Sequence, residues 1–106
     1  MAKLIRVTEP TLDVLGELLR APDAVWGLAL AKAVDRAPGT VYPILARLED
    51  LGWLAGEWEG ESDHAGPRRR LYRLTDGGRV EGAAVIAERR RRAATAAPRL
   101  AFGATG

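Results

Sequence analysis

The chain has 106 residues, of which 47% are hydrophobic and 28% charged, a balance typical of one globular domain. It contains no cysteine, which excludes disulfides and thiolate metal sites and permits a reducing, intracellular environment. No apolar run reaches the roughly 18 residues that a membrane-spanning helix needs. The N-terminal stretch also lacks the long apolar segment of a secretory signal, so neither membrane nor export is expected.

Basic residues are unevenly distributed, although the net charge is only +2. One group of arginines lies between positions 68 and 79, a second block covers 89–92, and acidic residues gather over 57–63. Local basic patches attract polyanions even when the total charge is small. The block over 89–92 is expected to be mostly solvated, because four consecutive helical residues point around the helix rather than to one side.

The sequence offers little for catalysis or metal binding. Its single histidine, His64, lies in a polar loop and has no second histidine or cysteine to complete a metal site. We find no Ser-His-Asp constellation and no glycine-rich phosphate loop. We therefore predict that the chain is not an enzyme, holds no metal and uses no cofactor.

Two helices are predicted at the start of the chain. Residues 9–20 carry apolar side chains at helical spacing, with Thr8 as the N-cap and Pro22 beyond the end. A second helix is expected over 24–35, with Asp23 as its cap. Both would bury one apolar face.

Glycine and proline punctuate the next segment. Gly27 is a poor helix former, so either the second helix begins late or another segment packs closely against it. A third helix is predicted over 38–52, beginning at Pro38 and ending at Gly52, which suits a left-handed final turn. We place Pro43 in the first turn, where a missing N–H group is tolerated.

The second half of the chain predicts a hairpin and a last helix. Strands are expected over 53–59 and 68–74, joined by a long polar loop, and both tryptophans of the first strand should pack in the hairpin or core. Tyr72 and Leu74 would share one face. The last helix, over 76–97, would be capped by Thr75 and stopped by Pro98.

This order of elements is that of a winged helix-turn-helix, a mostly α (α+β) fold with three helices, a two-stranded wing and a C-terminal helix. We divide the chain into a winged domain over 1–75, a C-terminal helix over 76–98 and a flexible tail over 99–106. In such modules the third helix enters the major groove of DNA, which is about 12 Å wide.

The third helix and the hairpin carry residue types that suit this binding mode. Thr40 can bond a phosphate or a base, Tyr42 can use its hydroxyl or its ring, and Arg47 can reach a guanine or the backbone. Arg36, in the turn before the helix, is a further candidate for DNA contact, and the helix N-terminus itself favours phosphate. The wing arginines either pair with acids across the hairpin or face DNA, and we expect DNA contact from Arg68, Arg69 and Arg70.

These segments resemble the PadR family of transcriptional regulators. The run GTVYPILARLEDLGWL over 39–54 is followed by PRRRLYRLTDGGR over 67–79. The agreement extends over two elements at fixed spacing, which makes it specific. The positions that match the family pattern are Gly39, Thr40, Tyr42, Pro43, Leu45, Leu48, Glu49, Gly52, Gly66, Pro67, Arg68, Tyr72, Leu74, Thr75 and Gly78.

The resemblance implies a homodimeric repressor that binds a pseudo-palindromic double-stranded DNA operator in the bacterial cytoplasm. The third helix, with Gly39 and Pro43 in its motif, would read the major groove, while the wing touches the neighbouring backbone or minor groove. The C-terminal helix would dimerise and pack against the partner's N-terminal helix. The small side chains of its stripe permit close approach, although an intramolecular core is the alternative. The candidate interface residues are Leu12, Leu15, Val80, Ala83, Ala84 and Ala87.

The chain departs from the family pattern in two places. The second helix begins with Trp26, Gly27 and Leu28, where the family often has His-Gly-Tyr. The single C-terminal helix resembles the short subgroup, but no aromatic residue between Thr75 and Pro98 is present to form a site for planar drugs. Two other functions stay open: a winged-helix protein-interaction module, and a small-molecule sensor with its ligand at the dimer seam.

Overall fold

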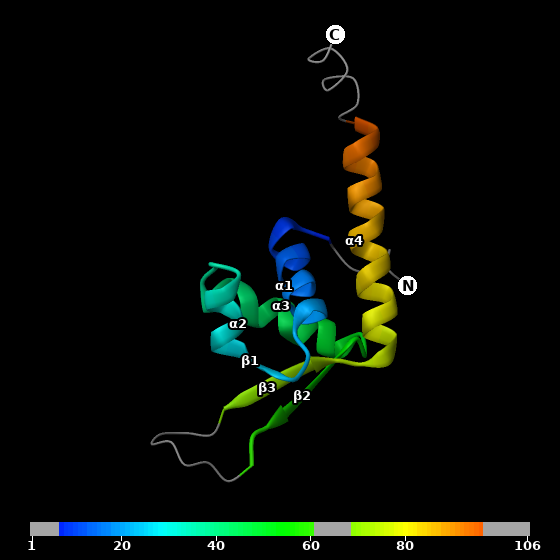
Figure 1. Ribbon diagram of the computed structural model, residues 1–106. Helices are drawn as coiled ribbons and strands as arrows, with labels where there is room; N and C mark the ends of the chain where they lie inside the picture. Colours follow the sequence, from blue (N-terminus) through cyan, green and yellow to red (C-terminus); the bar gives the residue numbers. More distant parts are fainter. Residues whose placement is uncertain (1–6, 61–68, 97–106) are drawn as a thin grey trace.

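Three helices form a bundle with a small antiparallel sheet on one side and a long C-terminal helix on another (Figure 1). The computed structural model describes residues 7–60 and 69–96. None of the described helices has the length and apolar character needed to cross a membrane. The elements in chain order are α1 (Glu9–Arg20), β1 (Val25–Trp26), α2 (Gly27–Ala33), α3 (Pro38–Asp50), β2 (Leu54–Trp58), β3 (Arg70–Leu74) and α4 (Asp76–Ala96).

The first helix has the bounds that its capping residues predict. The Thr8 side chain accepts a hydrogen bond from the Thr11 N–H group at 3.3 Å, and Pro10 lies in the first turn, where a proline is well tolerated. One face of α1 is buried and contributes Val14, Leu15 and Leu18 to the core. The helix is therefore held by a local cap and by one apolar face.

The second helix is shorter than predicted. It begins at Gly27 rather than at residue 24, and its N-cap is Trp26, whose side chain makes no capping hydrogen bond. The expected Asp23 cap is therefore wrong. The sequence left two explanations for Gly27, a late helix start and close packing of another segment. Both hold, because the helix begins at Gly27 and a tyrosine ring packs against this glycine.

The residues before α2 form a short strand that was not predicted. Val25 pairs with Tyr72 and Trp26 pairs with Leu71, so that β1 runs antiparallel to β3. The sheet has three strands in the order β1-β3-β2 rather than the two of a simple hairpin. Valine and tryptophan suit a strand, but the pairing itself depends on a distant part of the chain.

Left-handed residues follow both α2 and α3. Asp35 has a φ of 58° and Gly52 a φ of 80°. In each case this residue and the next donate their N–H groups to carbonyls of the preceding helical turn, which is the Schellman arrangement. Gly52 confirms the prediction from sequence. Asp35 carries a side chain into a region that costs most residues energy and that aspartate tolerates better than most.

The third helix begins at Pro38 as predicted, but Pro43 is not in its first turn. Pro43 lies inside α3, in the second turn. Its nitrogen carries no hydrogen, so the Gly39 carbonyl four residues earlier has no helical partner. Gly39 and Pro43 are both exposed, which leaves this carbonyl accessible to water. The helix tolerates the proline because the missing bond faces solvent.

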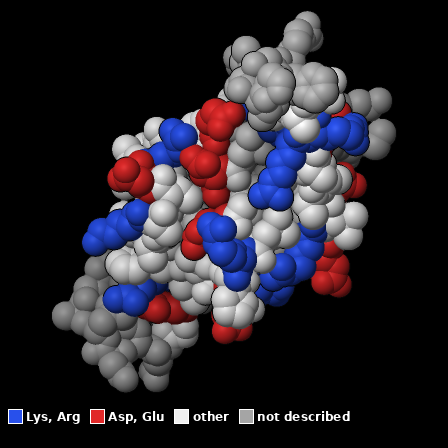
Figure 2. Space-filling view, turned by 45° about the horizontal axis from the view of Figure 1, so that its top comes forward, with Lys and Arg blue, Asp and Glu red and all other residues white. Residues whose placement is uncertain are grey.

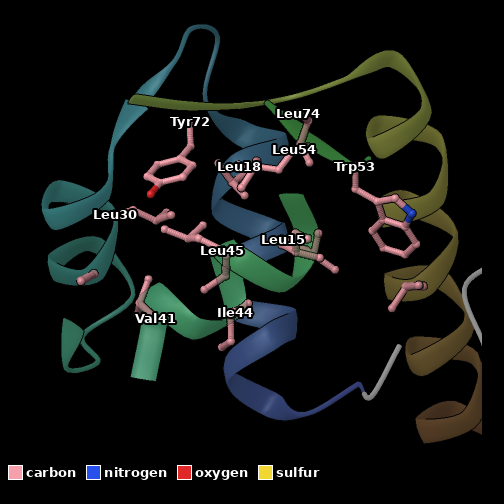
Figure 3. Close-up of a cluster of buried hydrophobic side chains, with 14 residues drawn as sticks. Leu15, Leu18, Leu30, Val41, Ile44, Leu45, Trp53, Leu54, Tyr72 and Leu74 are labelled. Carbon is pink, nitrogen blue, oxygen red and sulfur yellow. The ribbon is translucent and has the colours of Figure 1, made fainter. Parts of the chain in front are cut away.

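One hydrophobic core joins the helices and the sheet (Figure 3). Leu15 and Leu45 are fully buried at its centre, and the Tyr72 ring enters from β3. Trp53 is buried and extends toward α4, as expected for a core tryptophan. Trp58 behaves differently, because it lies on the wing with 61% of its surface exposed.

The start of α4 contacts the segment that follows α3. We call the four residues of this contact the Thr75 junction: Gly52, Trp53, Thr75 and Gly78. The Thr75 N–H group donates to the Trp53 carbonyl at 2.9 Å, and the Thr75 hydroxyl donates to the Gly52 carbonyl at 2.8 Å. The same hydroxyl oxygen accepts from the Gly78 N–H group at 2.9 Å, which confirms Thr75 as the cap of α4.

Gly78 allows the helix backbone to lie directly on the preceding strand connection. A Cβ atom at this position would lie 1.9 Å from the Trp53 carbonyl oxygen, far inside van der Waals contact. One turn later, a Cβ atom at Gly82 would lie 3.3 Å from Leu15 of α1. The inner face of α4 therefore approaches the domain through glycines.

We expect Gly78→Ala to lower the free energy of unfolding by about 2–4 kcal/mol, because the new methyl group meets backbone atoms that cannot move alone. Gly77→Ala is the matched control, since the nearest atom to its new Cβ is the Thr75 hydroxyl at 3.9 Å. That variant should gain up to about 1 kcal/mol from helix propensity. Urea denaturation measures both, and equal effects of the two variants would contradict the steric argument.

Candidate nucleic-acid interface

The outward face of α3 is exposed and carries small or cationic side chains. Gly39, Thr40, Pro43 and Arg47 are exposed, whereas Val41, Ile44, Leu45 and Leu48 on the opposite face are buried. Small side chains near the start of a helix allow its backbone to approach a partner closely. Arg47 lies further along the same helix and adds a positive charge to this face. The structure thus brings four of the sequence-predicted DNA-binding residues onto one surface.

Arg36 is tied to the first helix. Its Nε and Nη2 atoms lie 2.9 Å and 2.8 Å from Oδ2 of Asp13. The arginine side chain keeps about a third of its surface exposed, so the ion pair is screened by solvent and contributes little stability. Its geometric effect is to connect the turn before α3 to α1.

Tyr42 does not project freely from α3. The residue is half-buried and packs against the core, and a Cβ atom at Gly27 would lie 2.8 Å from its hydroxyl oxygen and 2.9 Å from the ring. The Tyr42 ring therefore packs against the backbone at the start of α2. Gly27, a poor helix former, provides the space for this aromatic side chain.

Two of the wing arginines, Arg69 and Arg70, are engaged within the chain. The Arg69 guanidinium lies 4.1 Å from the centre of the Trp26 ring, a cation–π contact. The Arg70 Nη2 atom lies 2.8 Å from Oε2 of Glu49, which belongs to α3 and not to the acidic strand. Arg68 lies outside the described residues. Sequence reasoning missed both Trp26 and Glu49 as partners, because each contact joins residues far apart in the chain.

Tyr72 lies beneath the Arg70 side chain. Burial raises the pKa of the Tyr72 hydroxyl above its usual range, and the nearby Arg70 opposes this shift without cancelling it. The hydroxyl is therefore uncharged at neutral pH. A neutral, buried tyrosine under a guanidinium gives the base of the wing a fixed polar contact.

The charges of the molecule do not form one uniform patch. Figure 2 shows lysine and arginine side chains interspersed with aspartate and glutamate on the face in view. This agrees with a net charge of only +2. An anion would therefore be attracted by local cations rather than by the field of the whole molecule.

The small-residue stripe of α4 is not part of the intramolecular core. Val80 is 69% exposed, and the alanines of the stripe, Ala83, Ala84 and Ala87, are exposed as well. Leu12 on α1 is half-buried. Leu15 has no exposed surface and belongs to the core, so it offers nothing for a second copy to contact.

The arginine block near the end of α4 divides between different partners. Arg91 and Arg92 both form ion pairs with Glu88, as expected for a solvated helix face. Arg89 instead reaches the start of α1, where it donates to the Val7 carbonyl at 2.8 Å and to the Glu9 carboxylate at 3.2 Å. This second link between α4 and α1 was not predicted.

These features define a winged-helix protein with an exposed face on its third helix. The transcriptional regulator PadR-like family model matches residues 17–84, which is more than half of the chain. The chain therefore belongs to the PadR-like family of transcriptional regulators, as the motif in its third helix and wing suggested. No curated protein sequence matches the chain.

Solved structures share this fold. A PadR family transcriptional regulator from Eggerthella lenta DSM 2243 is 28% identical over 82% of this chain and 80% of its own, with a TM-score of 0.69. The protein smu.1704 from Streptococcus mutans UA159 is 24% identical over 91% of this chain and 92% of its own, with a TM-score of 0.69. The PcaV transcriptional regulator from Streptomyces coelicolor, crystallised with its natural ligand, is 22% identical with a TM-score of 0.71. That match covers 86% of this chain, which spans 61% of PcaV.

We expect Gly27→Ala to destabilise the protein by about 1–2 kcal/mol, because its methyl group would displace the Tyr42 ring. In a Tyr42→Ala background the same change should cost at least about 1 kcal/mol less, and a double-mutant cycle of unfolding free energies measures this coupling. Gly16→Ala provides the control, because nothing lies within 4 Å of its new Cβ atom. Equal costs of Gly27→Ala in both backgrounds would show that the ring does not occupy this space.

Proposed function

We propose that this chain is a homodimeric repressor that binds a pseudo-palindromic DNA operator through α3 and the wing. The observation that carries the proposal is the uncovered outer face of α3, on which Thr40 and Arg47 lie beside small residues. The inner face of the same helix is fully used by the core. A helix that is anchored on one side and bare on the other is free to enter a major groove.

The side chains on this face suit the two kinds of contact that DNA offers. Thr40 lies near the N-terminus of α3, where a hydroxyl and the helix dipole both favour a phosphate oxygen. Arg47 is long enough to reach a guanine edge or a phosphate further along the groove. Gly39 and Pro43 let the backbone come close. Tyr42 would present only the exposed edge of its ring or its hydroxyl.

The wing is proposed to contact the flanking backbone or minor groove. Arg68 is the wing arginine for which we propose a phosphate contact, with support from Arg69, whose stacking on Trp26 leaves guanidinium edges free to donate. Arg36, half-exposed at the turn before α3, is proposed to touch the backbone next to the groove through the guanidinium N–H groups that do not face Asp13. Phosphate contacts of this kind position the protein without reading sequence.

The homodimer is proposed to form through α4. One exposed stripe of this helix is formed by Val80 and three alanines, whose small side chains permit two helices to pack closely. Leu12 of α1 is half-buried beside α4 and would complete the seam. Two copies related by a two-fold axis would present their α3 helices to successive half-sites, and a dimer bound across a promoter would block transcription.

An effector at the seam is the alternative that a specific observation favours. A groove of about 360 Å³ runs between α1 and α4, and its lining combines Leu19 and Ile86 with the cations Arg20 and Arg90. Ala83 and Ala87 of the proposed seam also line it. A small apolar acid would fit these residue types, and such a ligand would act on the dimer. We propose that the protein works in the cytoplasm and has no catalytic role.

Selection from a library of random or genomic duplexes should yield fragments with two inverted half-sites, which tests the function directly. We expect Arg47→Ala to weaken binding to the selected fragment by about 5- to 150-fold, because one base or phosphate contact is lost. Titrations by fluorescence anisotropy at several salt concentrations would distinguish a phosphate contact from a base contact. Loss of a phosphate contact reduces the slope of log affinity against log salt concentration by about 1. Arg92→Ala makes the same charge change on α4 and should bind normally. Equal binding by both variants would remove α3 from the interface.

Ala84→Glu should convert the dimer into a folded monomer, because a carboxylate would be buried in the helix seam without a partner. Sedimentation velocity measures the oligomeric state, and thermal unfolding checks the fold. Ala29→Glu is the matched control, since Ala29 is exposed on α2 away from α4 (Figure 1). An Ala84→Glu protein that remained dimeric would place the seam elsewhere.

A further inference from the structure

One ion pair connects the third helix to the wing. Glu49 lies in the last turn of α3, and Arg70 is the first residue of β3. The Arg70 Nη2 atom lies 2.8 Å from Oε2 of Glu49. The side chain of Arg70 keeps only 28% of its surface exposed, and that of Glu49 only 31%. A half-buried pair of this kind is screened less by salt than a surface pair. It therefore holds its geometry better.

The surroundings of the pair fix the guanidinium in place. The Arg70 guanidinium lies 5.3 Å from the centre of the Trp58 ring and 5.8 Å from that of Tyr72. A Cβ atom at Gly56 would lie 2.8 Å from both the Arg70 Nη2 atom and the Glu49 Oε2 atom. The glycine of β2 thus leaves the slot in which the pair sits. Elements α3, β2 and β3 all meet there.

The pair joins α3 to the end of the wing that is farther from the core. Leu54 and Leu74 pair at one end of the two strands and are buried, whereas Trp58, which is 61% exposed, pairs with Arg70 at the other end. β1 pairs with β3 only at Leu71 and Tyr72, so the Trp58–Arg70 end of the wing is a two-stranded ribbon, which twists strongly and is marginally stable alone. Its angle to α3 needs a contact beyond the buried leucines, and the Glu49–Arg70 pair supplies one.

We propose that Glu49 and Arg70 are positioning residues that hold the wing at a fixed angle to α3, so that helix and wing engage one duplex together. This inference rests on the proposed DNA-binding function. Arg70 then acts through Glu49 and does not bind phosphate itself. A carboxylate oxygen 2.8 Å from its Nη2 atom already accepts from one of its donors and offsets its charge.

The two roles of Arg70 predict opposite effects of removing Glu49. If Arg70 binds a phosphate directly, loss of the neighbouring carboxylate frees its donors and removes a repulsive charge, so DNA affinity stays equal or rises. If the pair positions the wing, loss of either partner releases the wing and affinity falls. The Glu49 variant therefore separates the two roles.

The experiment uses the full chain and a duplex selected by the wild-type protein. We expect Glu49→Ala and Arg70→Ala each to weaken binding by about tenfold, and the double variant to bind no more weakly than either single variant, as for two members of one unit. Hydroxyl-radical footprinting should show lost protection at the flanks that the wing covers. Protection at the half-site centres under α3 should remain.

Two further variants control for charge and folding. Glu57→Ala removes an exposed acid from β2 and should bind as tightly as the wild type or more tightly. Glu49→Gln keeps an oxygen that accepts a hydrogen bond from Arg70 and should retain most of the flank protection. Each variant is checked by thermal unfolding. Arg70→Lys, which keeps the charge but not the forked geometry, replaces Arg70→Ala if that variant does not fold.

Two outcomes would overturn the inference alone. One is a Glu49→Ala protein that binds at least as tightly as the wild type while Arg70→Ala binds more weakly, because Arg70 is then a direct phosphate contact. The other is unchanged affinity and footprint in both single variants. A wild-type protein that selects no duplex would overturn the proposed function, and this inference with it.

Discussion

The direction of α4 depends on backbone contacts at the Thr75 junction. Thr75 donates to the Trp53 carbonyl through its N–H group and to the Gly52 carbonyl through its hydroxyl, and the hydroxyl also caps α4. Gly78 lets the helix rest on the Trp53 carbonyl without an intervening side chain. The end of the third helix and the start of the last helix are therefore one rigid corner. Any surface carried by α4 has a fixed orientation to the outer face of α3.

The arginines near the wing illustrate how packing decides the role of a charge. Composition alone groups Arg69 and Arg70 with the other cations that would attract DNA. Their contacts differ, because Arg69 stacks on Trp26 of β1 whereas Arg70 joins Glu49 of α3. Both guanidiniums contact aromatic rings of the sheet. The base of the wing is thus built by cations, and the uncovered cation on α3 is Arg47.

The elements with local signals were predictable, and those made by distant pairing were not. Thr8, Thr75 and Gly52 carry caps and a left-handed turn within a few residues, so the bounds of α1, α3 and α4 followed closely from sequence. Strand β1 has only two residues and exists because β3 pairs with it. At the candidate site, the exposed face of α3 could be predicted from helical periodicity. The contact of Tyr42 with Gly27 required the packed structure.

Arg89 gives the N-terminal end of α1 a neighbour that the chain order does not suggest. Its guanidinium bonds to the carbonyl of Val7 and to Glu9, so the chain enters the first helix alongside α4. A reporter group attached at position 7 would therefore sense events along the last helix rather than at the outer face of α3.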